Sequence, residues 1–515
     1  MSSAAVNNKR IAKNTIFLYF RQILLMLVNL YTVRVVLAVL GEEDYGIYNV
    51  VGGFVAMFNI LSGALSVAIS RFITYEMGKP DVTIKRLQCI FSSSIIIQVV
   101  IGLIICLMIG SFGVWFVENK MVIPDERLDV TLYVLLFSTL SFFINLLSVP
   151  YNALIIAHEQ MKVFAYISIL EAILKLLIAY LLLVISADKL LLYTFCLVLI
   201  SFTIRGVYSV YCKRNFEECR FVWGLDKNLL SNMFIFSSWA FLGNGAIVLK
   251  DQGTTILLNL FSGPAVNASQ GIAMQIKNAV FSFVSNFMTA SAPQITKSFA
   301  AKEMDKMFSL TFMTCKYGFY LMILMLMPIY AGIDYILSLW LIEVPEHTAN
   351  FIILTLIYSL IECYATPIVR GVLADGKIKN YEIALTFIYL MNILGSYLCL
   401  KSGSIVEIVF ILNIIFKVFV VILLIIHSYQ RFNFPIIRFL KEVLMPNMVV
   451  FFISFILVFI ITQSENMNLL TFLIQSVIIF ITTTIVIYLF GINKKERSML
   501  NKIIAGRVSN IFFVK

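Results

Sequence analysis

The sequence predicts an all-α polytopic membrane protein with fourteen transmembrane helices, and three observations support this fold class. Of its 515 residues, 61% are hydrophobic and only 13% are charged, whereas soluble domains contain about 45–50% apolar and about 25% charged residues. Apolar runs of about 20 residues, the length that crosses a bilayer, recur along the whole chain. Short polar segments separate these runs, and none of them is large enough to fold as a soluble domain.

The apolar runs define the order of the expected spans. Their approximate limits are 14–38, 47–70, 89–116, 129–156, 164–186, 190–212, 232–260, 265–292, 309–332, 348–370, 382–400, 405–428, 444–462 and 469–491. The longest polar stretch between them follows the sixth span. We therefore expect an N-terminal lobe over residues 1–212, a cytoplasmic linker over 213–231, a C-terminal lobe over 232–428, and two further helices with a basic cytoplasmic tail over 429–515.

The distribution of lysine and arginine predicts the orientation. With the N-terminus in the cytoplasm, 27 of the 39 basic residues fall in cytoplasmic segments and four (Lys120, Arg127, Lys189 and Lys401) fall in outward loops. Cytoplasmic loops of membrane proteins carry such an excess, so both termini are expected to be cytoplasmic. The net charge of +11 is then explained by topology and by attraction to anionic membrane lipids, and we expect no nucleic-acid partner.

Two glycine-containing hinges suggest an internal repeat. Residues 40–58 lead into the second span and residues 261–276 lead into the eighth, and an offset of 222 residues aligns Gly41 with Gly263. The first six spans and the next six would then be two lobes with the same orientation, related by an axis along the membrane normal.

Charged residues inside the second hinge region mark a candidate site. Lys250 and Asp251 lie in the seventh span and Lys277 lies in the eighth. A charge at bilayer depth costs about 2.5–3.5 kcal/mol on insertion scales, so it indicates a pathway or a binding site. Because adjacent helical residues point about 100° apart, we expect Lys250 and Asp251 not to pair with each other.

The other charges inside spans favour a net positive interior. Glu171 and Lys175 are four residues apart, so they share a helix face and should form an ion pair, either structural or part of a proton or cation relay. Lys277 and Lys417 lie nearest mid-span, Arg21 adds a further base, and acids such as Glu362 are fewer. A cationic cavity suits phosphate groups, which lysine and arginine bind through charge and hydrogen bonds.

The remaining features give weaker predictions. Lys316 lies within about two turns of a span end, so its ammonium is expected to reach the interface. Residues 371–378 nearly match a P-loop, but Ile378 replaces the Mg²⁺-binding hydroxyl and the segment follows a helix, so we expect no NTPase. The three histidines (His158, His347 and His427) lack metal-ligand spacing. No nucleophile–base constellation or large outward loop is present, so we expect neither a metal site nor an enzyme.

The hinge motifs resemble those of the polysaccharide transporter family. They are LGEEDYGIYN at residues 40–49, ISRF at 69–72, SGPAVNASQGIAMQI at 262–276 and SAPQI at 291–295. This family comprises O-antigen-type flippases for lipid-linked oligosaccharides within the MATE-like, lipid II flippase-like MOP superfamily. The likeness extends over the whole chain, although the motifs are confined to the two hinges. Fourteen rather than twelve spans is similar to the lipid II flippase branch, which leaves the cargo open.

The resemblance implies a fold, a location and a cargo. It implies two six-helix, MATE-like lobes around a cationic cavity, alternating access, and a prokaryotic inner membrane. The cargo would be an undecaprenyl-diphosphate-linked oligosaccharide repeat for O-antigen, capsule or exopolysaccharide synthesis. The family's basic cavity residues map by span position onto Arg21, Lys250 and Lys277. Arg71, in the matched ISRF stretch, lies at the cytoplasmic end of its span and could bind lipid headgroups instead.

These observations lead to one main hypothesis and its alternatives. The main hypothesis is a flippase without a bound cofactor, coupled to H⁺ or Na⁺ through Asp251, Glu171 with Lys175, or Glu362. We also expect contacts with other polysaccharide-assembly membrane proteins. One alternative is a cation-coupled multidrug antiporter of the MATE type, although such a protein should have an acidic cavity. A polytopic glycan polymerase or ligase would need a large outward loop, and a structural scaffold would not need unpaired mid-span charge.

Overall fold

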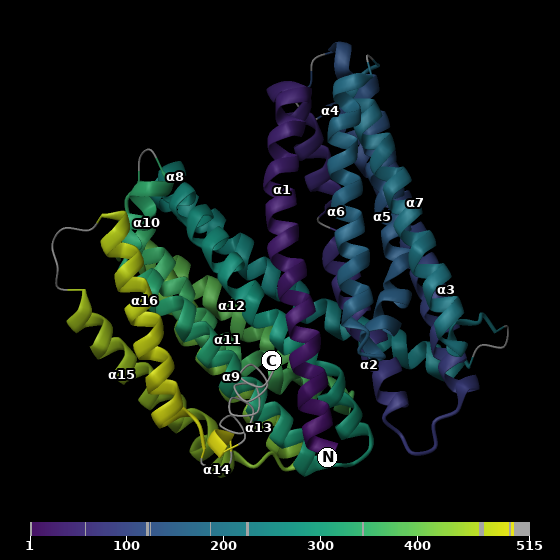
Figure 1. The fold of residues 1–515 in the computed structure, drawn as a ribbon. Coiled ribbons are helices and arrows are strands. Elements are labelled where there is room, and N and C mark those ends of the chain that lie inside the picture. Colours follow the sequence, from purple (N-terminus) through teal and green to yellow (C-terminus); the bar gives the residue numbers. More distant parts are fainter. Residues whose placement is uncertain are drawn as a thin grey trace, which may run out of the picture. The chain divides into compact units, whose positions relative to one another are not determined.

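A computed structural model describes residues 3–56, 58–119, 123, 125–185, 187–222, 226–341, 344–462, 468–493 and 496–498. Every secondary-structure element in these ranges is a helix (Figure 1). The predicted all-α class is therefore confirmed. Much of the predicted basic tail, including Lys502, Arg507 and Lys515, lies outside the described residues.

The helices follow one another through short connections (Figure 1). The longer ones are α1 (Ser3–Ala56), α2 (Asn59–Met77), α3 (Ile84–Met108), α5 (Leu128–Ala157), α6 (Met161–Val184), α7 (Lys189–Asn215), α8 (Lys227–Ala300), α9 (Met304–Ala331), α11 (Thr348–Asp375), α12 (Lys379–Lys401), α13 (Ile408–Phe432), α15 (Met445–Ile461) and α16 (Leu469–Val486). The shorter ones are α4 (Val114–Asn119), α10 (Ile333–Trp340) and α14 (Ile436–Phe439), with π-helical turns at Ile109–Gly113, Leu440–Leu444 and Ile487–Gly491 and 3₁₀ turns at Asp125–Arg127 and Glu217–Cys219.

Eleven helical segments among the described residues are long and apolar enough to span a membrane. Each of them coincides with one of the fourteen predicted spans. The other three predicted spans, 14–38, 47–70 and 265–292, are not among these segments. Within 14–38, which lies in α1, a shorter apolar helix covers Phe17–Val28, whereas 265–292 lies in α8. The last of them is rich in small and polar residues such as Asn267, Gln270 and Lys277. The protein is thus a multi-pass membrane protein, and the count of fourteen stays a prediction.

The two hinge glycines break two long helices in the same way. Gly41 interrupts α1 with φ 79° and ψ 172°, and Gly263 interrupts α8 with φ 81° and ψ −178°. This backbone conformation is accessible almost only to glycine, because it has no Cβ. The 222-residue offset deduced from the sequence therefore aligns two positions that share one unusual conformation.

The chain divides into two compact units. The first contains Met1–Leu249, Thr289–Met307 and Leu373–Thr386, and the second contains Lys250–Met288, Phe308–Val372 and Phe387–Lys515. Both units contain segments from beyond residue 249, so the expected lobe boundaries stay a prediction.

In the first unit, helices from the N-terminal part of the chain pack side by side. α5 lies along α7, and α1 lies along α6 (Figure 1). The core contains Phe91, Leu146 and Leu154, each no more than 1% exposed. Large apolar side chains also cover the outside, and Leu107 and Val184 are 74% and 83% exposed. An exposed apolar surface of this kind is expected where helices face lipid.

Two polar contacts join the later segments of the first unit to the earlier ones. The Arg71 guanidinium donates hydrogen bonds to the carbonyl oxygens of Leu373 (3.0 Å) and Ala374 (2.8 Å). These carbonyls belong to the last turn of α11, where carbonyl oxygens have no hydrogen-bond partners within their own helix. The buried Glu159 carboxylate accepts hydrogen bonds from Gln294 (2.6 Å) and Lys297 (3.1 Å). Arg71 thus caps a helix end, and the headgroup role considered for it stays a prediction.

In the second unit, α14 to α16 are fixed to the preceding helices. α15 packs beside α16 (Figure 1), and the buried Asn447 amide donates to the Tyr364 hydroxyl at 3.0 Å. The Lys316 ammonium lies 2.7 Å from the Glu496 carboxylate, and its side chain is only 3% exposed. Glu496 follows the last predicted span, so the expectation that Lys316 reaches the interface stays a prediction.

Candidate functional site

Three lysines of the second unit surround one tyrosine ring. The ammonium nitrogens of Lys250, Lys277 and Lys417 lie 5.0, 4.8 and 5.3 Å from the centre of the Tyr358 ring. Cations are attracted to the face of an aromatic ring at such distances. We call these four residues the lysine cluster.

The hinge at Gly263 explains how distant parts of the sequence meet at this cluster. Lys250 precedes the break in α8 and Lys277 follows it, so the two arms of the helix bring both lysines to the same ring. Tyr358 comes from α11 and Lys417 from α13. The predicted candidates Lys250 and Lys277 are therefore brought together.

Two carboxylates lie beside the lysine cluster. Glu362, one turn after Tyr358, forms an ion pair with Lys417 and accepts a hydrogen bond from the Thr366 hydroxyl at 3.2 Å. Asp251 lies 2.7 Å from the Lys250 ammonium. With all five groups ionised, the site carries a net charge of +1 among the described residues. The predicted positive interior is thus present in this unit.

The expectation that Lys250 and Asp251 do not pair is wrong. It rested on the angle between the two side chains where they leave the helix. The four-carbon stem of lysine can turn along the helix surface, so its ammonium reaches the neighbouring carboxylate. Lys250 is buried at 6% side-chain exposure, whereas Asp251 is 38% exposed, so the pair extends from the interior towards open space.

Lys277 differs from the other two lysines. No carboxylate within the described part of the chain forms an ion pair with it, and its ammonium lies over the Tyr358 ring. Lys250, Asp251, Glu362 and Lys417 all act on it electrostatically. An ammonium held inside a membrane protein without a direct counter-charge is expected to serve a ligand or a transport step.

A small cavity of about 30 Å³ adjoins the cluster. Lys250, Asp251, Lys277 and Tyr358 line it, together with Thr254, Gln270, Met274, Leu354, Thr355, Phe410 and Asn413. The side-chain oxygens of Gln270 and Asn413 are buried in the protein without a hydrogen-bond partner. Buried polar atoms normally find partners in protein or water, so these oxygens indicate a hydrated or ligand-binding space.

Arg21 lies in the first unit, on α1. Its guanidinium carbon is 4.6 Å from the centre of the Phe164 ring, and its Nε atom is buried without a hydrogen-bond partner. The two units are described separately, so the prediction that Arg21 shares one site with Lys250 and Lys277 stays a prediction.

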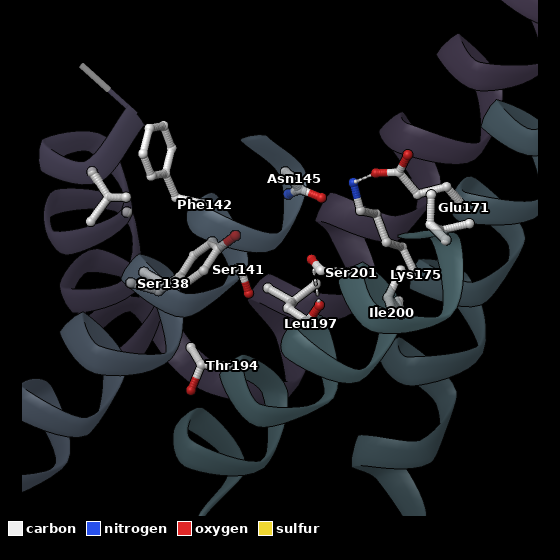
Figure 2. A pocket seen from close by; sticks show the side chains of 14 residues that line it. Ser138, Ser141, Phe142, Asn145, Glu171, Lys175, Thr194, Leu197, Ile200 and Ser201 are labelled. Atoms are coloured by element: carbon white, nitrogen blue, oxygen red, sulfur yellow. Dashed lines mark hydrogen bonds and ion pairs between the residues drawn. The ribbon is translucent and has the colours of Figure 1, made fainter. Parts of the chain in front are cut away.

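Glu171 and Lys175 form the predicted i, i+4 ion pair, with 2.7 Å between the carboxylate and the ammonium. They line a second cavity, in the first unit, with a volume of about 220 Å³ (Figure 2). Both side chains are 40% exposed. The geometric prediction is confirmed, and the pair's function remains open between the two predicted roles.

Sequence reasoning missed Tyr358 and did not connect Lys417 with Glu362. A signal was present in each of the two helices. Tyr358 and Glu362 are four residues apart on α11, and Asn413 and Lys417 are four residues apart on α13. Each pair of polar residues shares one face of an otherwise apolar helix, which could have marked those faces as directed towards a polar site.

Comparisons with known proteins agree with these features. The family model described as polysaccharide biosynthesis protein matches residues 11–299. No curated protein matches the sequence. Solved structures of MATE transporters share the fold, although their sequence identity to this chain is 14% or less.

An outward-facing multidrug resistance MATE family transporter of the MOP superfamily superposes with a TM-score of 0.70 at 14% identity, covering 82% of this chain and 96% of that one. A MATE transporter of Vibrio cholerae gives 0.68 at 14% identity, covering 84% and 100%. A MOP superfamily transporter from Pyrococcus furiosus gives 0.69 at 13% identity, covering 82% and 96%. The description of that last protein states that the reverse polarity of its binding pocket suggests a different function.

The family match covers more than half of the chain, and the fold is that of MOP superfamily transporters. The chain therefore belongs to the polysaccharide biosynthesis protein family and has the fold of MATE transporters.

Proposed function

We propose that this protein is a flippase that moves an undecaprenyl-diphosphate-linked oligosaccharide from the cytoplasmic to the outer leaflet of a prokaryotic inner membrane. The cargo would serve surface polysaccharide synthesis, and both termini would be cytoplasmic. The lysine cluster carries this proposal, because three ammonium groups share one ring while only two carboxylates offset them.

The division of charge within the cluster suggests separate roles for its lysines. Lys417 is neutralised by Glu362, and Lys250 is partly neutralised by Asp251. Lys277 keeps its full charge available, so it would make the main contact with a diphosphate, and Lys250 would add a second contact. Lysine binds phosphate as a point charge with up to three donors, and hydrogen bonds to charged groups contribute about 1.5–3 kcal/mol. Arg21 would assist if the transport cycle brings it to the same cargo.

Coupling to an ion would use the carboxylate that is easiest to reach. Asp251 is the more exposed of the two carboxylates at the cluster, and a proton or Na⁺ that replaced Lys250 at Asp251 would release the lysine for the cargo. Such a change can drive transport only if the ion and the cargo bind the two states of the protein with different affinity.

The second candidate function is cation-coupled multidrug antiport, and the MATE fold supports it. The tyrosine at the centre of the cluster is also a surface on which a cationic drug could stack. The excess of lysine over carboxylate at the same ring disfavours a cationic cargo, since like charges repel at close range. The two candidates therefore differ in the sign of the cargo's charge.

Reconstituted liposomes can separate these candidates. We expect the wild-type protein to move a fluorescent undecaprenyl-diphosphate oligosaccharide between leaflets, followed by quenching from outside. Lys277→Ala should reduce the rate about tenfold or more, since about 1.4 kcal/mol corresponds to a factor of ten. Lys277→Arg should retain more activity, because the charge remains.

The matched control is Lys401→Ala. Lys401 also lies over a tyrosine ring, at 5.9 Å from the centre of Tyr397, but its side chain is exposed at the end of α12. This variant should transport like the wild type. A wild-type protein that moves ethidium and not the lipid-linked sugar would establish the second candidate in place of the first.

A further inference from the structure

The cavity of the first unit has a lining unlike that of the lysine cluster. Its walls, formed by α1, α5, α6 and α7, carry many hydroxyl groups, among them those of Ser138, Ser141 and Ser201 (Figure 2). Tyr48 and Phe142 contribute aromatic faces. Its volume of about 220 Å³ lies below the range of about 300–1,000 Å³ that sites for drug-sized ligands occupy, so the cavity suits a single small ligand.

The charges in this cavity cancel each other. Glu171 and Lys175 are paired at 2.7 Å, so the ammonium already occupies the position that a metal cation would take beside the carboxylate. A cation would have to displace Lys175, and an anion would have to displace Glu171. A neutral polar ligand could therefore bind the remaining donors and acceptors of the pair without separating its two charges.

Several polar groups in the wall have unused hydrogen-bonding capacity. The Ser141 hydroxyl is buried without a partner, and within the described residues the Asn145 amide has no hydrogen-bond partner either. Figure 2 shows the Asn145 side chain directed toward the Glu171–Lys175 pair. The Ser201 hydroxyl donates to the Leu197 carbonyl at 3.1 Å, which leaves its oxygen lone pairs available to accept.

Mixed donors and acceptors beside apolar ring faces match the chemistry of a sugar ring. Each sugar hydroxyl both donates and accepts a hydrogen bond, and the C–H face of the ring packs against an aromatic side chain. Ser141, Asn145 and Ser201 would bind hydroxyls directly, and the ion pair would accept from one hydroxyl and donate to another. A compact metal ion would leave most of this lining unused.

We propose that this cavity is a binding site for a neutral sugar residue. The inference rests on the proposed function, in which it assigns the first unit to the glycan and the second unit to the diphosphate. It also removes Glu171 and Lys175 from the candidates for ion coupling and leaves Asp251 and Glu362.

The test is sugar binding by the full-length protein in nanodiscs without lipid-linked cargo. Methyl glycosides of glucose, galactose, mannose and N-acetylglucosamine serve as probes, and binding is followed by saturation-transfer difference NMR. We expect saturation transfer from at least one probe. Asn145→Leu and Ser141→Val should weaken it about tenfold, since each replaces a polar group with an apolar one.

Three control variants distinguish this site from its alternatives. Thr203→Val changes an exposed residue of α7, two positions after Ser201, whose hydroxyl bonds only to the Leu199 carbonyl, and it should bind like the wild type. Lys277→Ala should also keep glycoside binding. The double variant Glu171→Gln with Lys175→Gln removes the carboxylate that a cation would need, so it tests whether the cavity holds a cation.

The proposal is overturned if no probe shows saturation transfer, or if Asn145→Leu and Ser141→Val bind as well as the wild type. It is also overturned if Na⁺ raises the melting temperature in the wild type but not in the double variant, because the cavity would then hold a cation. Glycoside binding without lipid flipping would contradict the proposed function alone. Lipid flipping without glycoside binding would contradict this inference alone.

Discussion

Lys277 and Lys417 approach the same tyrosine ring but differ in what neutralises them. Lys417 has Glu362 as its partner, whereas Lys277 has no ion-pair partner in the described part of the chain. A paired buried charge supports the fold, because removing one member leaves the other uncompensated. An unpaired charge can be removed without that penalty. The two lysines should therefore respond differently to the same substitution.

We predict that Lys417→Met lowers thermal stability and that Lys277→Met does not. Replacing Lys417 leaves Glu362 uncompensated. The expected cost is about 1–3 kcal/mol, below the ~3–5 kcal/mol of a fully buried pair, because the Glu362 side chain is still 24% exposed. Melting in detergent monitored by tryptophan fluorescence would measure this. Adding Glu362→Gln to Lys417→Met should recover most of the loss, and failure to recover it would contradict the pairing argument.

A second residue-scale prediction concerns acid stability at Glu407, just before α13. Burial raises the pKa of this carboxyl, but hydrogen bonds from His347 (2.6 Å) and Asn350 (3.1 Å) outweigh burial and hold its pKa below the usual 4.5. A lowered carboxyl pKa stabilises the fold above the unfolded-state pKa, and this contribution is lost as the pH falls through the folded-state pKa.

The melting temperature of the wild type should therefore fall as the pH drops below about 4.5, and that of Glu407→Gln should fall less steeply over the same interval. Glu303→Gln is a suitable control, because Glu303 forms only an exposed pair with Lys306. Identical pH profiles for the wild type and Glu407→Gln would contradict the prediction.

The residues of the candidate site show which contacts a sequence can reveal. The Glu171–Lys175 pair follows from helical spacing alone, and the structure contains it. The pairing of Glu362 with Lys417 joins two helices, so it depends on packing that spacing cannot predict. The Lys250–Asp251 pair was missed because backbone direction says little about where a long lysine side chain ends.

At the scale of elements, the hinges of α1 and α8 are the features that the sequence predicted best. Gly41 and Gly263 share their backbone conformation at the predicted offset. Among the described residues other than the chain neighbours, an added Cβ would meet no atom within 4 Å at either position. Any effect of replacing these glycines must therefore come from the backbone.

We predict that Gly41→Ala and Gly263→Ala each destabilise the protein by about 1–3 kcal/mol, because alanine is strained at positive φ. Gly46→Ala and Gly271→Ala are matched controls, since both positions are helical and equally open. These controls should be neutral or slightly stabilising, as alanine favours helix. Melting temperatures of the four variants test the prediction, and equal effects at hinge and control positions would contradict it.

At the scale of the whole molecule, charge distribution predicts a topology that the fold alone does not fix. Alkaline phosphatase fused after Asp188 or Ser402 should be active, because both positions fall in predicted outward loops. Fusions after Arg220 or Gly376 should be inactive, because those loops are predicted to be cytoplasmic. The opposite pattern would reverse the predicted orientation. If a fusion in a predicted outward loop and a fusion in a predicted cytoplasmic loop were both active, the number of spans between them would differ from the prediction, and the count of fourteen would be wrong.

Composition was sufficient to predict a helical membrane protein, because only lipid-facing helices need so many apolar runs. One predicted span, 265–292, lies in α8 but is not among the segments that length and hydropathy support. It contains polar residues such as Asn267, Gln270 and Lys277. Hydropathy alone therefore gives weak support to a span that contributes Lys277 to the lysine cluster.

The helix cap provided by Arg71 has a consequence for the order of synthesis. Arg71 is made early, yet the carbonyls that it binds, those of Leu373 and Ala374, follow about 300 residues later. Until α11 has been translated and inserted, the guanidinium must remain with water or with the rings of Phe72, Tyr75 and Phe236 beside it. The N-terminal helices can enter the membrane first, but the hydrogen bonds of Arg71 to α11 can form only after residue 374 has been translated.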